Sequence, residues 1–198
     1  MSKNFSNITN HLANNGLAIF LFHGVIKKSI YRIRNYTNKH IETNAFEQCV
    51  KRLSSVGHAM SMDDVLVSML SGDSPPPNSF AITFDDGFEN NLSEAAPILK
   101  KYNVPACFYV ASSFIEKNGM SWIDQIELCL ERFSPKELIM PWQTKPYSLD
   151  NIELEKSFLN EVRKNVKGSR DINPNEIVQI IYDQCGEKVI ASSDDPLD

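Results

Sequence analysis

The stretch Phe80–Gly87, which reads FAITFDDG, constrains the fold of this chain more than any other segment. It begins by alternating large apolar side chains with small or polar ones, and this period of two predicts a β-strand. The strand runs directly into two adjacent aspartates, Asp85 and Asp86. Because glycine permits a sharp backbone turn, Gly87 is predicted to end the strand and to swing both carboxylates toward one mouth.

Two neighbouring carboxylates repel each other unless a cation or a proton is shared between them. A metal ion is one resolution, with one carboxylate as its ligand and the other left free as a base. The alternative is structural, because aspartate before glycine is common in turns, where the carboxylate hydrogen-bonds its own backbone. The apolar strand leading into the pair favours a functional site, since α/β folds place their chemistry at the carboxyl ends of strands.

Two further strands are predicted on either side of this stretch. Leu17–Phe22 is a continuous apolar run, typical of a strand buried on both faces. It ends at His23, which is either a hydrogen-bonded structural histidine or a second functional group at a strand end. Val104–Val110 is the third strand, and a helix from about Leu92 precedes it, with a kink or a late start because of Pro97. Strand, helix and strand predict a right-handed βαβ unit.

The segment before the central strand contains a loop and two helices. Lys27–His40 is basic and polar without a clear period, which predicts a loop. A helix follows Thr43. Ser61 and Asp64 then have the spacing of a capping box at the start of a second helix. The methionines of this region, Met60, Met62 and Met69, are expected to fill the core.

The last third of the chain is predicted to be helical and carries no chemical motif. Helices are expected over Ile126–Phe133, after an Asp150 cap and after an Asn173 cap. Residues 124–190 are therefore interpreted as a structural or lid-like insertion.

Composition sets outer limits on function. The 198 residues, 42% of them hydrophobic and 23% charged, suit one soluble globular domain. A net charge of −5 argues against nucleic acid as a partner. We find neither a membrane-spanning run nor a secretory signal, so a cytoplasmic protein is expected. Four widely spread cysteines predict reduced thiols rather than a zinc cluster or a disulfide framework.

The chain resembles the polysaccharide deacetylases, the carbohydrate esterases that share the NodB homology domain. Thr83–Gly87 is similar to the first motif of that family. Leu21–Val25 resembles its first strand, and Ala95–Val110 its next helix and strand. Ser121–Asp124 resembles the aromatic stretch that comes afterwards. The ordered set, over roughly residues 17–125, is more specific than the paired aspartates alone.

The resemblance implies an α/β fold, namely a partial, distorted (β/α) barrel with a helical insertion after the third strand. Residues 1–123 would form the N-terminal part of the barrel and residues 124–198 the insertion. Asp85 would be the general base and Asp86 a ligand of a divalent metal, with zinc as the expected ion. His23 and Trp122 would contact the substrate or support the site. The implied reaction is removal of N-acetyl, less often O-acetyl, groups from an acetylated carbohydrate.

The sequence departs from the family pattern where the metal site should be completed. The family supplies two histidines from a His-x-x-x-His-Pro motif downstream of the aspartates. Every histidine of this chain lies upstream of them; they are His11, His23, His40 and His58. A catalytic zinc usually needs three protein ligands. The chain is therefore expected to be the N-terminal portion of a longer deacetylase, with a missing C-terminal part, and to be inactive by itself.

Two other classes of protein remain open from the residues. Paired aspartates at a strand end also bind magnesium in phosphoaspartate proteins, which need a further aspartate and a lysine. A non-catalytic carbohydrate-binding remnant would use exposed aromatic side chains for stacking on sugars. Its candidates are Trp122, Trp142 and Tyr147.

Overall fold

The computed structural model describes residues 12, 16–28, 30–112 and 119–190, and these divide into two compact units. The sheet unit comprises Leu12 and residues 16–28 and 38–112. The helical unit comprises residues 30–37 and 119–190. No helix among the described residues is long and apolar enough to cross a membrane.

The sheet unit is built around strand β5 (Ser79–Phe84), whose six residues are all buried. Strand β1 (Leu17–Phe22) pairs with it in parallel along its whole length. On its other side β5 pairs first with β4 (His58–Ala59) and then with β6 (Ala106–Phe108), both in parallel. The predicted central strand and the parallel βαβ arrangement are confirmed. The fold is mixed α/β, and the described strands do not close into a barrel.

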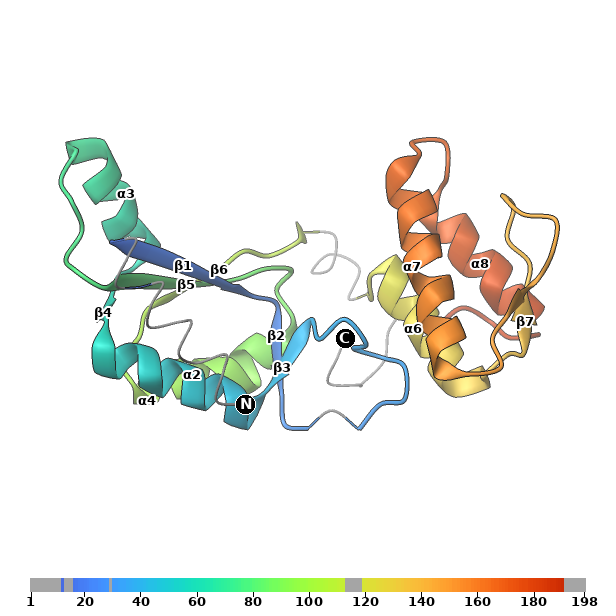
Figure 1. Cartoon of the computed structure of the whole chain (residues 1–198), viewed down its shortest axis with the longest axis horizontal. Helices are drawn as coiled ribbons and strands as arrows, with labels where there is room; N and C mark the ends of the chain where they lie inside the picture. Colours follow the sequence, from blue (N-terminus) through green and yellow to red (C-terminus); the bar gives the residue numbers. More distant parts are fainter. Residues whose placement is uncertain (1–11, 13–15, 29, 113–118, 191–198) are drawn as a thin grey trace. The chain divides into compact units, whose positions relative to one another are not determined.

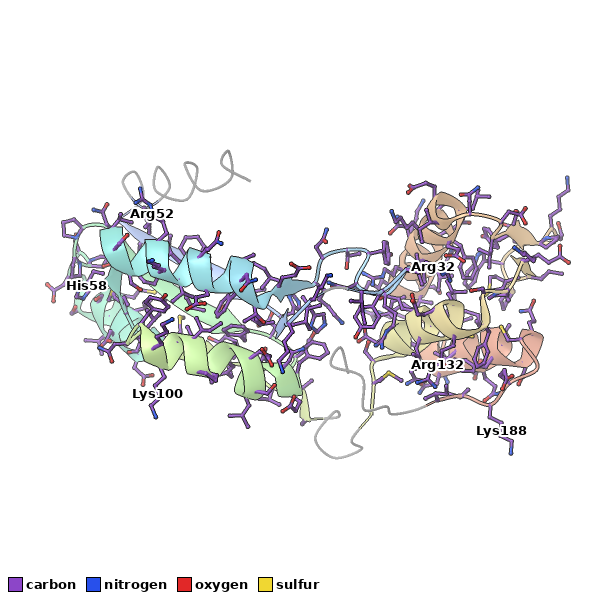
Figure 2. All side chains as sticks on the ribbon, turned by 90° about the horizontal axis from the view of Figure 1, so that it is seen from below. Arg32, Arg52, His58, Lys100, Arg132 and Lys188 are labelled. Atoms are coloured by element: carbon purple, nitrogen blue, oxygen red, sulfur yellow. The ribbon has the colours of Figure 1, made fainter. Side chains whose placement is uncertain are left out.

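Helices α2 (Thr43–Val56) and α4 (Ala96–Lys101) cover one face of this sheet, and α3 (Met62–Ser71) lies on the other (Figure 1). Figure 2 shows α2 and α4 lying side by side. The core on their face gathers around the aromatic rings of β1, α2 and β5. Phe84 is central to it, with ring centroids 5.6 Å from Phe22, 5.7 Å from Phe46 and 5.0 Å from Phe108.

The prediction that β1 is buried on both faces is wrong. Ile19 is 50% exposed and Leu21 is 54% exposed. Their register partners on β5 are Ala81 and Thr83, so they lie on the face that α2 and α4 do not cover. Of the β1 residues on that face, only Leu17 packs with the small cluster formed by Met60, Val65 and Ala81. Side chains of a strand alternate between faces, so an apolar run is buried only where both faces find a partner.

Helix α3 begins as predicted but packs less of its surface than its sequence suggests. Ser61 and Asp64 form the capping box, with Asp64 N donating to Ser61 Oγ at 3.1 Å. Met60 is buried and Met62 is partly buried, but Met69 is 75% exposed, so it is not a core residue. The reason is geometric, because the helix contacts the sheet through its first turn and Val65.

A small second sheet flanks the carboxyl end of β1. It pairs β2 (Gly24–Ile26) with β3 (His40–Glu42) in parallel. After the Asp85–Gly87 turn the chain forms a π-helical turn, η1 (Asn91–Ala95), which continues into α4. Pro97 lies in the first turn of α4, directly after the π-helical turn, so the helical run is irregular at this proline, as expected.

The helical unit packs three helices around one apolar core: α6 (Trp122–Phe133), α7 (Ile152–Gly168) and α8 (Pro174–Gln184). Two short strands, β7 (Glu137–Leu138) and β8 (Tyr147–Ser148), form an antiparallel pair. Asn173 caps α8 as predicted. The cap of α7 is Asn151 rather than Asp150, because the amide oxygen of Asn151 accepts from the N–H groups of Glu153 and Leu154. All four cysteines are free, as expected.

Residues 30–37, predicted as part of a loop, are integrated into the helical unit. Ile33 is fully buried in its core. The Arg32 guanidinium pairs with Glu155 and donates to the Leu130 carbonyl at 2.7 Å. Figure 2 shows Arg32 among the side chains of this unit. The segment makes these contacts with residues about one hundred positions away, which no local period reveals.

Candidate functional site

The paired aspartates lie where the central strand ends. Asp85 still belongs to the ladder, because its N–H donates to the Phe22 carbonyl at 2.9 Å. The turn then forms over two residues, since Asp86 has φ of 72° and Gly87 has φ of 80°. A left-handed φ is tolerated by aspartate and favoured by glycine. The sequence placed the turn at Gly87, and the structure begins it one residue earlier.

Gly87 is also required by a close approach of the neighbouring strand. A Cβ atom built on Gly87 would lie 2.5 Å from Val110 Cγ1 and 3.2 Å from Val110 Cα. The Ala111 N–H donates to the Asp86 carbonyl at 3.2 Å, so the chain beyond β6 is bound to this turn. Any side chain at Gly87 would therefore displace either the turn or the backbone at Val110.

His23, Asp85 and Tyr109 occupy equivalent positions on three adjacent strands. Phe22, Phe84 and Phe108 are register partners across β1, β5 and β6. Each of the three residues directly follows one of these phenylalanines, and the Tyr109 N–H donates to the Phe84 carbonyl at 2.8 Å. The backbone hydrogen bonds thus continue for one residue beyond the strands. They bring residues with an imidazole, a carboxylate and a phenol together at the carboxyl ends of the strands.

Tyr109 is the residue that the sequence reasoning missed. Its side chain is half exposed, and its pKa is raised, first by a hydrogen bond with Cys107 and further by the negative charge of Asp85. The ladder places the backbone of Tyr109 beside that of Asp85. The sequence predicted a strand over Val104–Val110, but the structure ends β6 at Phe108 and so places Tyr109 just beyond the strand, next to Asp85.

The described residues do not assemble a metal centre on their own. Asp85, Asp86 and His23 are each half-buried, so solvent reaches all three side chains. Among residues 12, 16–28, 30–112 and 119–190, no group of three or more histidine, cysteine, aspartate or glutamate side chains is arranged to hold a metal ion. Asp86 and His23 could contribute at most part of the three-ligand set that a catalytic zinc requires.

Trp122, the other predicted site residue, belongs to the helical unit. It begins α6 and packs against the core of that unit. The neighbouring Ser121 and Asp124 are explained by helix capping. The Ser121 hydroxyl accepts from the Asp124 N–H at 3.3 Å and donates to the Asp124 carboxylate at 2.6 Å. This arrangement is the N-cap of α6. A contact between Trp122 and substrate stays a prediction.

The two other candidate sugar-stacking aromatics are bonded to each other. Trp142 Nε1 donates to the Tyr147 hydroxyl at 3.0 Å, and that hydroxyl donates to Glu161. Both rings are partly buried against the core of the helical unit. These contacts give Trp142 and Tyr147 a structural role, and their use as a sugar platform stays a prediction.

Comparison with protein families gives a match over the segment that contains the paired aspartates. Residues 72–154 match the family described as polysaccharide deacetylase, which confirms the resemblance drawn from the motifs over that segment. The matched segment contains the whole of β5 and the Asp85–Gly87 turn. No curated protein shows significant similarity to the chain.

Several solved structures, two of them described as deacetylases, are similar to the chain. The deacetylase PplD of Streptococcus pyogenes, in complex with acetate, is 20% identical, with a TM-score of 0.45, and the match covers 59% of this chain and 51% of that one. A de-N-acetylase of Aggregatibacter actinomycetemcomitans is 21% identical, with a TM-score of 0.43 and coverage of 72% and 52%. IcaB of Ammonifex degensii is 18% identical, with a TM-score of 0.43 and coverage of 91% and 88%. The chain thus spans about half the length of the first two structures.

Proposed function

We propose that this chain is part of a carbohydrate deacetylase, a hydrolase that removes N-acetyl, less often O-acetyl, groups from a sugar. The observation that carries the proposal is the position of Asp85 and Asp86. They lie at the carboxyl end of the central parallel strand, inside the segment that matches the polysaccharide deacetylase family. Carboxyl ends of parallel strands are where α/β enzymes gather their reactive groups.

We also propose that the sheet unit is a partial, distorted (β/α) barrel. Its parallel strands carry α2 and α4 on one face, as the outer helices of such a barrel would be. The opposite face, with the half-exposed Ile19 and Leu21, would then line the barrel interior against further strands. The helical unit would be an insertion that follows β6.

Asp85 is assigned the role of general base. In amide hydrolysis a water molecule attacks the acetyl carbonyl carbon, and a carboxylate within hydrogen-bond reach takes the proton from that water. The proton is afterwards delivered to the departing amine, so that acetate and a free amino sugar leave. Asp85 suits this role because the ladder bond to Phe22 fixes its backbone while its side chain keeps solvent access.

Asp86 is assigned one ligand position of a divalent metal, with zinc as the expected ion. The described residues do not complete that site, so we derive no step through the metal. The remaining ligands are proposed to come from a C-terminal part of the domain outside this chain.

The assignment is tested by titrating zinc into the chain beside Asp86→Ala, in a calorimeter. We expect no stoichiometric binding above that of the variant. Tight binding that Asp86→Ala abolishes would contradict the proposed incompleteness and would direct the search for a third ligand to His23 first.

Deacetylation itself is tested by acetate release from an N-acetylglucosamine oligomer and from an O-acetylated one. The chain alone should release no more acetate than Asp85→Asn. The chain joined to the remainder of its domain should release acetate, and Asp85→Asn should abolish that release. Failure of the joined protein on both substrates would reject the function.

The absence of a three-ligand cluster among the described residues favours one second candidate, a non-catalytic carbohydrate-binding module. Such a module would bind an N-acetylglucosamine oligomer with the same affinity after chelator treatment and in Asp86→Ala. Loss of binding under either condition would exclude it.

A further inference from the structure

The segment that follows the aspartate turn is held by a buried polar contact whose central residue is Asn90. Asn90 is 2% exposed and lies four residues after Asp86. The Val25 N–H donates to Asn90 Oδ1 at 3.0 Å. Asn90 Nδ2 lies 3.1 Å from Nδ1 of His40, which is itself 3% exposed. One amide side chain therefore joins the exit of the turn to both strands of the β2–β3 sheet.

The backbone bond fixes which way the amide of Asn90 points. A backbone N–H can only donate, so the atom of Asn90 that faces Val25 must be its oxygen. The NH₂ group then faces His40, and because it too can only donate, Nδ1 of the imidazole must accept. His40 is therefore neutral, with its proton on Nε2.

Gly24 leaves the space in which these groups meet. A Cβ atom on Gly24 would lie 2.1 Å from His40 Nδ1 and 2.6 Å from Asn90 Oδ1. Such distances are incompatible with any side chain at this position unless the imidazole and the amide move. The glycine next to His23 is thus explained by packing against His40 and Asn90.

The same imidazole also supports the residue directly after the turn. Phe88 is 8% exposed, and its ring lies 4.6 Å from the His40 ring at an interplanar angle of 70°. Lys39 Nζ lies 4.6 Å from the centre of the Phe88 ring, in a cation–π arrangement. His40, the first residue of β3, therefore contacts both Phe88 and Asn90, and Lys39 just before the strand contacts Phe88 as well.

Hydrogen bonds to residues before and after His23 in the sequence consequently hold the aspartate turn and the segment that follows it. Before His23, the Phe22 carbonyl accepts from the Asp85 N–H at 2.9 Å. After it, the Val25 N–H donates to Asn90. The two bonds hold the Asp85–Gly87 turn against the segment that carries His23.

We propose that Asn90 and His40 are positioning residues, which fix the Asp85–Gly87 turn relative to His23 without touching substrate. The functional meaning of this inference rests on the deacetylase assignment of Asp85 and Asp86. The structural part of the inference is that a neutral His40 accepts from Asn90 and thereby holds the turn. This part can be tested without an activity assay.

The first experiment records the backbone and imidazole NMR signals of the chain, of Asn90→Ala and of the matched control Glu89→Gln. Glu89 is exposed and lies in the same segment. The wild-type His40 should show the Nε2–H form. In Asn90→Ala the amide signals of Asp85, Asp86 and Gly87 should shift, and the Val25 N–H should exchange about tenfold faster because its acceptor is lost. Glu89→Gln should leave all of these signals in place.

A second variant keeps the inference testable if Asn90→Ala does not fold. In Asn90→Asp one carboxylate oxygen still accepts from Val25, but the other faces His40 Nδ1 and requires a proton there. His40 should therefore change to an Nδ1-protonated form. A wild-type His40 protonated on Nδ1, or unmoved turn signals in a folded Asn90→Ala, would overturn the inference.

An activity measurement separates this inference from the proposed function. In the chain joined to the remainder of its domain, Asn90→Ala should lower kcat for acetate release and leave KM unchanged, because the turn is displaced and no substrate contact is lost. If that protein releases no acetate in its wild-type form, the deacetylase assignment fails. The NMR result still decides whether Asn90 and His40 hold the turn.

Discussion

The two units of the molecule differ in whether they bury charged side chains. The helical unit buries four of them, namely Arg34, Asp124, Glu127 and Glu155. Among the described residues of the sheet unit no lysine, arginine, aspartate or glutamate is buried. Its paired aspartates, Asp85 and Asp86, stay half-buried at a strand end.

This difference separates structural charges from charges available for chemistry. In the helical unit Glu127 accepts from Arg163 at 2.8 Å and from the Asn35 N–H at 3.1 Å, so its oxygens are engaged by the protein. A buried carboxylate must be satisfied in this way, because burial without partners is costly. In the sheet unit the buried polar side chains are uncharged, as in Asn90, and the carboxylates remain accessible to solvent.

The units also differ in what their sequences reveal. The sheet unit carries the only motif with chemical content, yet one face of its sheet keeps exposed apolar side chains such as Ile19 and Leu21. The helical unit has no such motif and a well-closed core. Both tryptophans, Trp122 and Trp142, belong to the helical unit, so intrinsic fluorescence reports its unfolding while amide exchange reports that of the sheet unit.

The largest effect is expected at the aromatic centre of the sheet unit. Phe84→Ala removes a fully buried ring that contacts three other phenylalanines and should lower the free energy of unfolding by about 4 kcal/mol. Amide exchange of the β5 residues measures it. If the two units unfold independently, the tryptophan fluorescence transition in urea should not move. A loss below about 1 kcal/mol would show that the site-bearing core is loosely packed.

The next effect tests the buried ion pair of the helical unit. Arg163→Met removes the guanidinium that lies 2.8 Å from the Glu127 carboxylate, whose side chain is 5% exposed, and should destabilise the unit by about 3 kcal/mol. Tryptophan fluorescence in urea measures this loss. The matched control is Lys101→Met in the sheet unit, where the Lys101–Glu47 pair is solvent-exposed and should contribute much less than the buried pair. Equal losses in the two variants would remove the distinction between the units.

A smaller effect is expected from the helix caps, and it should be alike in both units. Ser61→Ala in α3 and Asn151→Ala in α7 each remove a side-chain acceptor for backbone N–H groups, which should lower stability by about 1 kcal/mol. Amide exchange in the first turn of α3 and fluorescence for α7 report the losses. A change within about 0.3 kcal/mol at either site would show that water replaces that cap.

The α3 cap also predicts a pH dependence. Hydrogen bonds from the Ser61 hydroxyl and then from its N–H lower the pKa of Asp64 in the folded state. A lowered folded-state pKa stabilises the protein above the unfolded-state value of about 3.9, and this contribution is lost as the pH falls through the folded-state pKa. The stability difference between wild type and Ser61→Ala should therefore shrink below about pH 4. A difference that is constant from pH 7 to pH 3 would contradict this reading.

The smallest effect is expected on the open face of the sheet. Leu21→Ser changes an apolar side chain that is 54% exposed, so the free energy of unfolding should stay within about 0.5 kcal/mol of wild type. Amide exchange of β1 and β5 measures the change. A larger loss would mean that Leu21 is covered in solution, as expected if further chain or a second copy packs on this face.

The candidate site was predictable where the signal lies within a few residues. The strand before Asp85, the turn at Gly87 and the placement of His23 at a strand end all follow from alternation and glycine chemistry. The fixing of that turn by Asn90 and His40 was not predictable, because the contact joins residues 50 positions apart. Tyr109 lies between these cases, since its strand was predicted but its register beside Asp85 was not.

The sequence by itself determined the central strand, the order of the helices and several of their caps, because side-chain periodicity and capping act over one or two turns of chain. Only the tertiary structure decided that residues 30–37 belong to the helical unit, that Ile19 and Leu21 remain exposed, and that Met69 lies outside the core. Burial depends on which distant surface arrives opposite a side chain. No local pattern contains that information. The sequence shows that an apolar residue in a strand or a helix can be buried, but not whether it is buried.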